Sequence, residues 1–156
     1  MLPIEFAIPL ICALPTVSGA SMCSCPLPKS PRAQVEAFAP RADAIFAGRV
    51  AQIRWKVAEI DSGHADSKMM FLLAVFVPTK SWKGDVADTV VVWTPDNVGA
   101  CGFTFEEGEQ YLVFATTRDA TSLSSGLCTG TRTLAEAGPY LRVLGPGRAV
   151  GQDRAP

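Results

Sequence analysis

The placement of four cysteines constrains the fold of this chain more than any other feature of its sequence. Cys23 and Cys25 are separated by one residue, whereas Cys101 and Cys128 stand alone in the middle and late parts of the chain. A bridge between Cys23 and Cys25 would close a very tight and strained ring. Both remaining pairings join the start of the chain to its later parts. Each bridge over so long a loop contributes about 4–5 kcal/mol on the chain-entropy model, but the two should not be summed because they begin close together.

The first residues of the chain predict a signal peptide for export. Residues 6–17 (FAIPLICALPTV) are almost wholly apolar, but a bilayer span needs roughly 20 such residues. The small residues SGA at 18–20 follow, in the pattern of a cleavage site. Pro9 and Pro15 disfavour the alternative, a buried N-terminal helix or strand. We therefore expect a signal peptide over residues 1–20, with cleavage after residue 20 or 22.

Removal of this segment would also change the cysteine count. The chain has five cysteines, and Cys12 lies inside the expected signal peptide. The cysteines that remain form an even number, which in an exported protein implies two disulfides. The expected location is secreted or extracellular, or, for a bacterial protein, periplasmic or at the cell surface. We expect a monomer without a transmembrane segment.

Composition and charge exclude several classes of function. Hydrophobic residues make up 48% and charged residues 19% of the 156 residues, a balance typical of a single globular domain. Lys and Arg number 14 against 15 Asp and Glu, so the net charge is -1. Such a chain has no long-range field that would attract nucleic acid. We therefore expect no nucleic-acid partner.

The residues that could hold a metal or perform catalysis are few. His64 is the single histidine, which makes a histidine-based catalytic zinc site or a facial iron triad implausible. A zinc site made of the four cysteines is disfavoured, because Cys23 and Cys25 are too close in sequence for the usual ligand spacing. The chain contains no phosphate loop or nucleophile elbow. We expect neither a cofactor nor an enzymatic activity.

The pattern after the cysteine pair predicts short strands with flanking helices. Apolar side chains between residues 51 and 57 alternate with polar ones, which is the period of a half-buried strand, and Gly48 permits a bend just before them. Residues 69–77 (MMFLLAVFV) form a continuous apolar run ended by Pro78, which favours a central strand. The expected elements are a helix over 31–39 capped by Ser30, strands over 43–60, 69–77, 90–93, 110–116 and 122–128, and a terminal helix over 131–144 broken at Gly138-Pro139.

These elements predict a mainly β fold. Five short strands with a strongly bent first strand are typical of a five-stranded OB-type Greek-key barrel, here with short flanking helices. The domain is expected over residues 23–144, followed by a Gly- and Pro-rich tail over 145–156 that should be flexible. The tryptophans are expected to pack in the core or at the barrel ends rather than to stack on bases. The residues expected in the core are Ile53, Trp55, Phe71, Leu73, Val75, Val91, Leu112 and Phe114.

Several motifs occur in an order that is found in a known family. Cys-Ser-Cys-Pro at 23–26 follows the expected signal peptide, and DAIFAGRV at 43–50 stands where that family's first strand begins. FVPTKSWKG at 76–84 resembles the exit of its second strand, and the segment TPDNVGACG at 94–102 resembles its loop before the third cysteine. EQYLVFA at 109–115 and then Cys128 follow in order. Over residues 23–144, the chain resembles the netrin-like domain, and within it the N-terminal inhibitory domain of the tissue inhibitors of metalloproteinases.

This resemblance implies an OB barrel with disulfides Cys23–Cys101 and Cys25–Cys128, and a secreted inhibitor of zinc metalloproteinases. In those inhibitors the residue at the position of Cys23 is the mature N-terminus, and its α-amino group and carbonyl oxygen chelate the zinc of the protease. Cys23 would therefore touch a metal only in the target enzyme, where a catalytic zinc keeps one position open. Ser24 would enter the specificity pocket. The protease-binding residues implied are Cys23, Ser24, Cys25, Pro26, Gly99, Ala100 and Cys101.

The mature N-terminus decides between this function and its alternatives. Cleavage after Ala20 would leave Ser21-Met22 ahead of Cys23 and block its amine, whereas cleavage after Met22 would free it. The family's third disulfide of this domain also has no counterpart here, since no further cysteine remains. The first alternative is an extracellular netrin-like module that binds another extracellular protein without inhibiting it. The second is a structural protein of the cell surface or periplasm.

Overall fold

The computed structural model describes residues 23–60, 63 and 67–151, and within them the fold is mainly β. The expected signal peptide and His64 lie outside these residues. The helices and strands, in chain order, are α1 (Pro31–Phe38), β1 (Ala44–Glu59), β2 (Lys68–Lys83), β3 (Val90–Pro95), η1 (Val98–Ala100), β4 (Gln110–Asp119), β5 (Ser122–Ser124), η2 (Leu127–Thr129), β6 (Arg132–Thr133), η3 (Leu134–Glu136), α2 (Gly138–Leu144) and β7 (Arg148–Ala149), where η marks a 3₁₀-helix.

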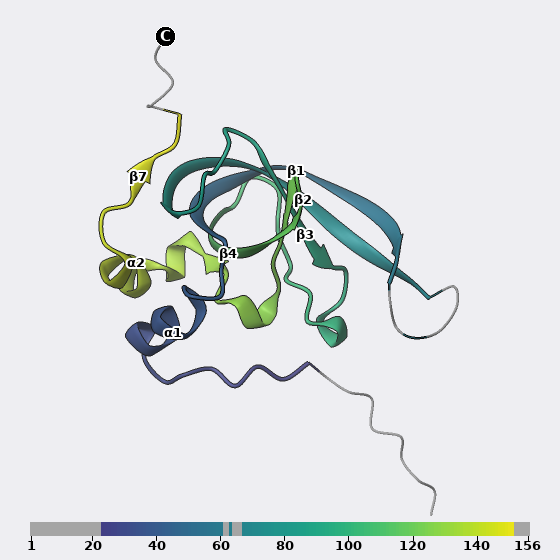
Figure 1. The fold of residues 1–156 in the computed structure, drawn as a ribbon, viewed down its shortest axis with the longest axis horizontal. Coiled ribbons are helices and arrows are strands. Elements are labelled where there is room, and N and C mark those ends of the chain that lie inside the picture. Colours follow the sequence, from purple (N-terminus) through teal and green to yellow (C-terminus); the bar gives the residue numbers. More distant parts are fainter. Residues whose placement is uncertain (1–22, 61–62, 64–66, 152–156) are drawn as a thin grey trace, which may run out of the picture.

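Five of the strands close into a ring (Figure 1). The order around the ring is β1, β2, β3, β5 and β4, and β4 pairs with the first half of β1 to close it. Neighbouring strands are antiparallel except β3 and β5, which are parallel. The two α-helices lie together on one side of the ring. The expected mainly β fold, with five principal strands and short flanking helices, is confirmed.

Gly48 allows β1 to bend where two other strands pack against it. The register between β1 and β2 shifts between Ala47 and Gly48, which marks a β-bulge. A Cβ atom on Gly48 would lie 2.9 Å from the Cα atom of Pro78 and 2.9 Å from the carbonyl oxygen of Val77. Because both obstructing atoms belong to the backbone, a larger residue does not fit there. The bend expected at Gly48 is confirmed.

β2 does not end at Pro78, where the sequence predicted that it would. The strand continues to Lys83, because Pro78 lies opposite Gly48 at the bulge. The ladder is already interrupted at that point, so a residue without an N–H group is tolerated. The apolar run is therefore only the first part of a longer strand.

The segment after α2 is attached to the far part of β2. β7 pairs with β2, with Ala149 opposite Lys80, and the indole Nε1–H of Trp82 donates a hydrogen bond to the carbonyl oxygen of Gly145 at 2.8 Å. Over residues 145–151 the chain is thus held against the barrel, where its composition predicted a flexible tail. Residues 152–156 lie outside the described residues.

Two groups of buried side chains form the interior. The first lies inside the ring and contains Phe46, Phe76, Phe105 and Tyr111, whose aromatic rings meet edge to face. The second joins β4 to the helices, where Leu112 and Phe114 pack with Val35 and Phe38 of α1 and with apolar residues of α2. β4 therefore contributes to both groups, because successive side chains of a strand point to opposite faces.

The eight residues expected in the core are only partly the ones that are buried. Phe71, Leu112 and Phe114 are buried, Ile53, Leu73, Val75 and Val91 are half-buried, and Trp55 is exposed. In β2 the interior positions are instead Leu72, Ala74 and Phe76. The predicted phase was wrong there because a continuous apolar run has no alternation that distinguishes its two faces. Trp55 is exposed because the second half of β1 extends beyond the ring.

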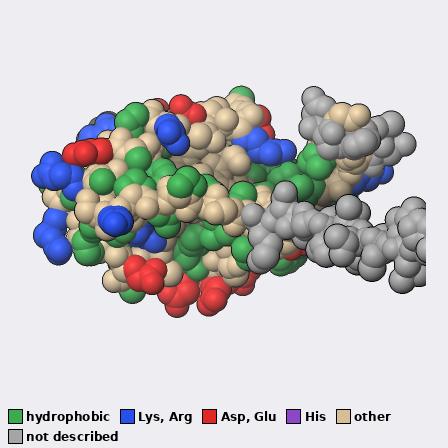
Figure 2. Space-filling model, turned by 90° about the horizontal axis from the view of Figure 1, so that it is seen from below, with side chains coloured by type: hydrophobic (Ala, Val, Ile, Leu, Met, Phe, Trp, Pro, Cys, Tyr) green, Lys and Arg blue, Asp and Glu red, His purple; other side chains and the backbone are tan. Residues whose placement is uncertain are grey.

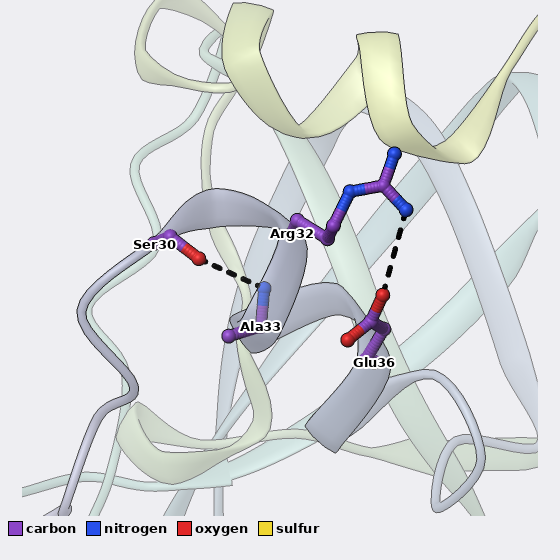
Figure 3. Close-up of polar contacts among 4 residues, drawn as sticks. All are labelled: Ser30, Arg32, Ala33 and Glu36. Atoms are coloured by element: carbon purple, nitrogen blue, oxygen red, sulfur yellow. Dashed lines mark hydrogen bonds and ion pairs between the residues drawn. The ribbon is translucent and has the colours of Figure 1, made fainter.

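α1 begins where its sequence predicts. The hydroxyl of Ser30 accepts a hydrogen bond from the backbone N–H of Ala33 at 3.2 Å (Figure 3), which is the usual N-cap interaction. Arg32 and Glu36 form an ion pair of 3.6 Å one turn apart on the same helix (Figure 3). Because both side chains are mostly exposed, solvent screens this pair and it contributes little to stability.

The turn between β4 and β5 contains a carboxylate with a lowered pKa. Asp119 accepts hydrogen bonds from the hydroxyl of Ser122 and from the N–H and hydroxyl of Thr121. These bonds, with that of Ser122 first, lower the pKa of Asp119 from 3.8 to about 2. Since the folded pKa lies below the unfolded one, the resulting stability is present above pH 4 or so and is lost as the pH falls toward about 2.

We therefore expect an NMR titration of Asp119 to show a midpoint near 2. In an Asp119→Asn variant, the free energy of unfolding should fall less steeply between about pH 4 and pH 2 than in the original protein, because the amide does not titrate. A midpoint at the ordinary aspartate value would show that the hydrogen bonds of this turn do not form in solution.

Candidate binding edge at the N-terminal disulfides

Two disulfides attach the start of the described chain to the barrel. Cys23 is bonded to Cys101 and Cys25 to Cys128, and in each pair the Cα atoms are 5.2 Å apart. This pairing is the one implied by the resemblance and one of the two that spacing left open. The bridges hold residues 23–28, which have no regular secondary structure, against the turns that contain η1 and η2.

The turn that receives Cys23 is built by short-range hydrogen bonds. The side chain of Asn97 accepts a hydrogen bond from the backbone N–H of Ala100 at 2.8 Å and so begins η1. The N–H of Cys101 donates to the carbonyl oxygen of Val98 at 3.0 Å. Cys101 has a φ of 63°, the one positive φ of a non-glycine residue in the described chain. Such a conformation persists only where neighbouring contacts determine it, so the direction of the Cys101 side chain is fixed locally.

Two glycines let neighbouring backbone segments approach Cys101 closely. A Cβ atom on Gly126 would lie 2.5 Å from the carbonyl oxygen of Cys101, and one on Gly102 would lie 1.8 Å from the carbonyl oxygen of Pro95. Both obstructing atoms belong to the backbone, so rotation of a side chain cannot relieve the clash. Backbone packing therefore sets the position of Cys101 and, through the bridge, the position of Cys23.

The two bridges lie against each other. The Sγ atoms of Cys23 and Cys128 are 3.7 Å apart, and the Sγ of Cys101 lies within 4.8 Å of both. Three sulfur atoms at this spacing would suit a metal, but metals bind the thiolate form of cysteine, and these sulfurs are bonded in disulfides. The sulfur contact is therefore packing between two crosslinks.

The predicted site residues fall into two segments that the first bridge joins. Residues 23–26 form one segment and residues 99–101 the other, with Cys23 bonded to Cys101. The exposed members are Ser24, Pro26 and Gly99, and the half-buried ones are Cys23, Cys25, Ala100 and Cys101. Exposed residues therefore lie on both sides of the Cys23–Cys101 bridge, and a partner can contact both segments at once.

Two apolar residues of this edge were not predicted. Leu27 is 52% exposed and Val98 is 57% exposed. Each stands beside a predicted site residue in the sequence, Leu27 after Pro26 and Val98 before Gly99. Both residues have a sequence signal that could have predicted their exposure. Each is an apolar residue in a turn or in an extended proline-rich segment, where side chains are rarely buried.

The edge is uncharged and its backbone is free to pair. Residues 23–28 and 97–102 contain no acidic or basic side chain. The C=O groups of residues 24–27 and the N–H groups of Ser24, Cys25 and Leu27 make no hydrogen bond to any other described residue, and Pro26 has no N–H. Figure 2, a view onto this side of the molecule, shows hydrophobic and uncharged atoms along the middle of the face and most charged side chains toward its margins. Such an edge can bind a partner through apolar contacts and backbone hydrogen bonds.

Comparisons with known proteins leave the family open: no family model matches the chain, and no curated protein matches it at a significant level. In the part of the chain that the structure describes, no helix is long and apolar enough to cross a membrane. What the molecule itself defines is a disulfide-linked, mainly β domain with an exposed, uncharged edge at Cys23.

Proposed function

We propose that this protein is a secreted, netrin-like inhibitor of zinc metalloproteinases, built on an OB-type Greek-key barrel. The order of strands around the ring, with β3 parallel to β5 and a bent β1 that closes the ring, supports the OB type. The two disulfides support an oxidising, extracellular compartment. The partner is the active-site cleft of a zinc protease.

The observation that carries this proposal is the attachment of Cys23. It is bonded to Cys101, in a turn whose backbone is tightly packed, and its neighbour Ser24 is exposed. A short, uncharged segment that is fixed at one point loses little conformational entropy when it enters a cleft. The edge therefore has the rigidity and the exposure that an inhibitor of this kind requires.

The inhibitory chemistry would come from the backbone of Cys23. A catalytic zinc in a protease keeps one coordination position for water. The α-amino nitrogen and the carbonyl oxygen of an N-terminal Cys23 would replace that water as two donors to the enzyme's zinc. The amine must be neutral to bind, and an ordinary α-amino pKa of about 7.7–8.0 leaves part of it neutral at pH 7. Ser24, the next residue, would contact the specificity pocket.

The test compares two forms of the protein that differ only at the start. One begins at Cys23 and the other at Ser21, so that two residues block the amine. We expect the Cys23 form to inhibit zinc metalloproteinases and to spare serine proteases, whereas the Ser21 form should not inhibit. Acetylation of the α-amino group of the Cys23 form should have the same effect, because the nitrogen donor is lost.

The outcomes separate the proposal from its alternatives. Equal inhibition by both forms would contradict chelation by the amine of Cys23. Inactivity of both forms, with both disulfides verified by peptide mapping, would favour the netrin-like interaction module. A Ser24→Gly variant of an active form should change which proteases are inhibited more than whether any is, because Ser24 supplies the contact in the pocket.

A further inference from the structure

The second half of β1 has an open edge. β1 pairs with β4 only over Ala44–Arg49, but it pairs with β2 as far as Glu59 opposite Lys68. The hairpin therefore runs out of the ring as a ribbon (Figure 1). Beyond Arg49, no described strand pairs with the other side of β1. An edge of this kind is able to accept a further strand.

The backbone of this edge is directed away from the hairpin at alternate residues. The N–H of Ile60 donates to Ser67 within the hairpin at 3.0 Å. On the opposite side, the N–H of Ile53 donates to the carboxylate of Glu107 at 2.6 Å, which occupies the edge at that point. Because backbone groups alternate in direction along a strand, Trp55 and Val57 direct their N–H and C=O groups to the open side.

One face of the hairpin is apolar and exposed. Trp55 is 58%, Val57 55% and Met70 46% exposed. Val57 lies opposite Met70, and Trp55 lies opposite Leu72, which is buried in the ring. These side chains thus continue the interior face of the ring into solvent. A cluster of exposed apolar side chains next to an open strand edge marks an interaction surface.

The other face of the hairpin is basic. Lys56 lies opposite Phe71, and its Nζ atom is 5.2 Å from the centre of the Trp93 ring. The guanidinium of Arg118 lies 4.2 Å from the same ring centre. Arg54, on the same face as Lys56, donates two hydrogen bonds to the neutral side chain of Gln52. None of these three cations forms an ion pair with a described carboxylate, so their charge is available to a partner.

We propose that the open edge of β1 binds an extended segment of a partner protein in which acidic and apolar residues alternate. The segment would add a strand beside Trp55 and Val57, with its apolar side chains on their face and its acidic side chains on the face of Arg54 and Lys56. Opposite charges on neighbouring strands are favourable, and like charges are not. The acidic Glu107 at Ile53 limits the segment to the part of the edge beyond it.

A second copy of this chain fits the edge poorly. In a symmetric dimer, two β1 edges would pair antiparallel about a two-fold axis near Trp55. Arg54 of one copy would then lie opposite Lys56 of the other, and like charges on neighbouring strands are destabilising. The turn after β3 lies beside Met70, whose carbonyl oxygen accepts a hydrogen bond from the N–H of Asp96 at 3.1 Å. The proposed surface nevertheless contains none of residues 23–26 or 99–101, so the proposal does not depend on metalloproteinase inhibition. Its failure and the failure of that function are therefore distinguishable.

The test uses the complete, disulfide-bonded protein and two capped peptides of about seven residues, the length of a typical strand. One alternates glutamate with valine and the other lysine with valine. We expect the glutamate peptide to bind more tightly and to protect the N–H groups of Trp55 and Val57 from hydrogen exchange. In the double variant Arg54→Glu, Lys56→Glu, the lysine peptide should bind more tightly than the glutamate peptide.

The matched control is the double variant Arg41→Glu, Arg142→Glu, which makes the same charge change at exposed residues of or next to the helices. This control should still bind the glutamate peptide more tightly.

A second pair of variants tests the strand geometry. Val57→Pro removes an N–H on the open side and should weaken binding roughly tenfold or more, because hydrogen bonds to the added strand are lost. Val57→Thr keeps that N–H and should bind nearly as well as the original. Equal binding of both peptides, absence of binding, protection elsewhere on the protein, or a concentration-dependent dimer formed through β1 would overturn the proposal.

Discussion

Replacing both Cys25 and Cys128 by serine is expected to lower the free energy of unfolding by about 2–5 kcal/mol. The bridge joins residues 103 positions apart, and closing so long a loop removes much of the conformational freedom of the unfolded chain. Since domains of this size are stabilised by only about 5–15 kcal/mol, a loss in this range removes a large part of the total. Denaturant unfolding, with midpoint and slope compared, measures it.

The other bridge provides a matched control. Cys23–Cys101 spans 78 positions, and because the entropy depends on the logarithm of loop length, its removal should cost nearly the same. Removing both bridges should cost less than the sum of the two losses. Once one bridge is formed, the other closes only the shorter loop that contains residues 101–128. Fully additive losses would contradict this account.

Replacing Gly102 by alanine is expected to cost about 3 kcal/mol, the upper part of the range for overpacked sites. The new Cβ would lie 1.8 Å from the carbonyl oxygen of Pro95 and 2.9 Å from that of Asn97. The end of β3 and the turn of η1 would have to separate, which would also strain the hydrogen bond from Gly102 to Asn97. The change would move Cys101, so we expect it to disturb the candidate binding edge as well as the stability.

Gly138→Ala is the control for this substitution. Apart from its chain neighbours and the backbone of its own helix, no atom lies within 4 Å of the position of its Cβ, and Gly138 begins α2, where alanine is favourable. Its effect on the free energy of unfolding should stay within about 0.5 kcal/mol. Similar unfolding midpoints for the two variants would show that the approach of Gly102 to Pro95 is not as close as the structure has it.

Local signals in the sequence were sufficient for most elements of this fold. The cap at Ser30 depends on residues a few positions apart, and Gly48 and Pro139 are signals that single residues provide, although the partner of Gly48 at the bulge, Pro78, is distant in the sequence. Alternation and turn residues likewise separate the strand segments. The structure has the cap and the bulge where the sequence predicts them.

Two other predictions were wrong in extent: the strand expected over 122–128 ends at Ser124, and the helix expected over 131–144 begins only at Gly138. Residues 132–133 pair with β4 as β6 instead, a long-range contact that local signals do not contain.

The candidate edge could be predicted only in part. The cysteine positions excluded a bridge between Cys23 and Cys25 on strain, but they left two long-range pairings open, because loop entropy is nearly the same for both. The tertiary structure selects the pairing Cys23–Cys101 and Cys25–Cys128, because it places the turn before Cys101 against the segment that contains Cys23. Leu27 and Val98 were missed because a side chain in an irregular segment has no periodicity from which its exposure follows.

The sequence by itself thus determined the kinds of elements, their order and the set of residues that crosslink the start of the chain. The tertiary structure decided which faces are buried. Leu72 and Ala74 face the interior instead of Leu73 and Val75. Pairing of β2 with β1 and β3 in the ring determines which side of the apolar run faces inward. Trp55 is exposed for the same reason: burial of a strand requires packing from outside it, and β1 keeps two neighbouring strands only as far as Arg49.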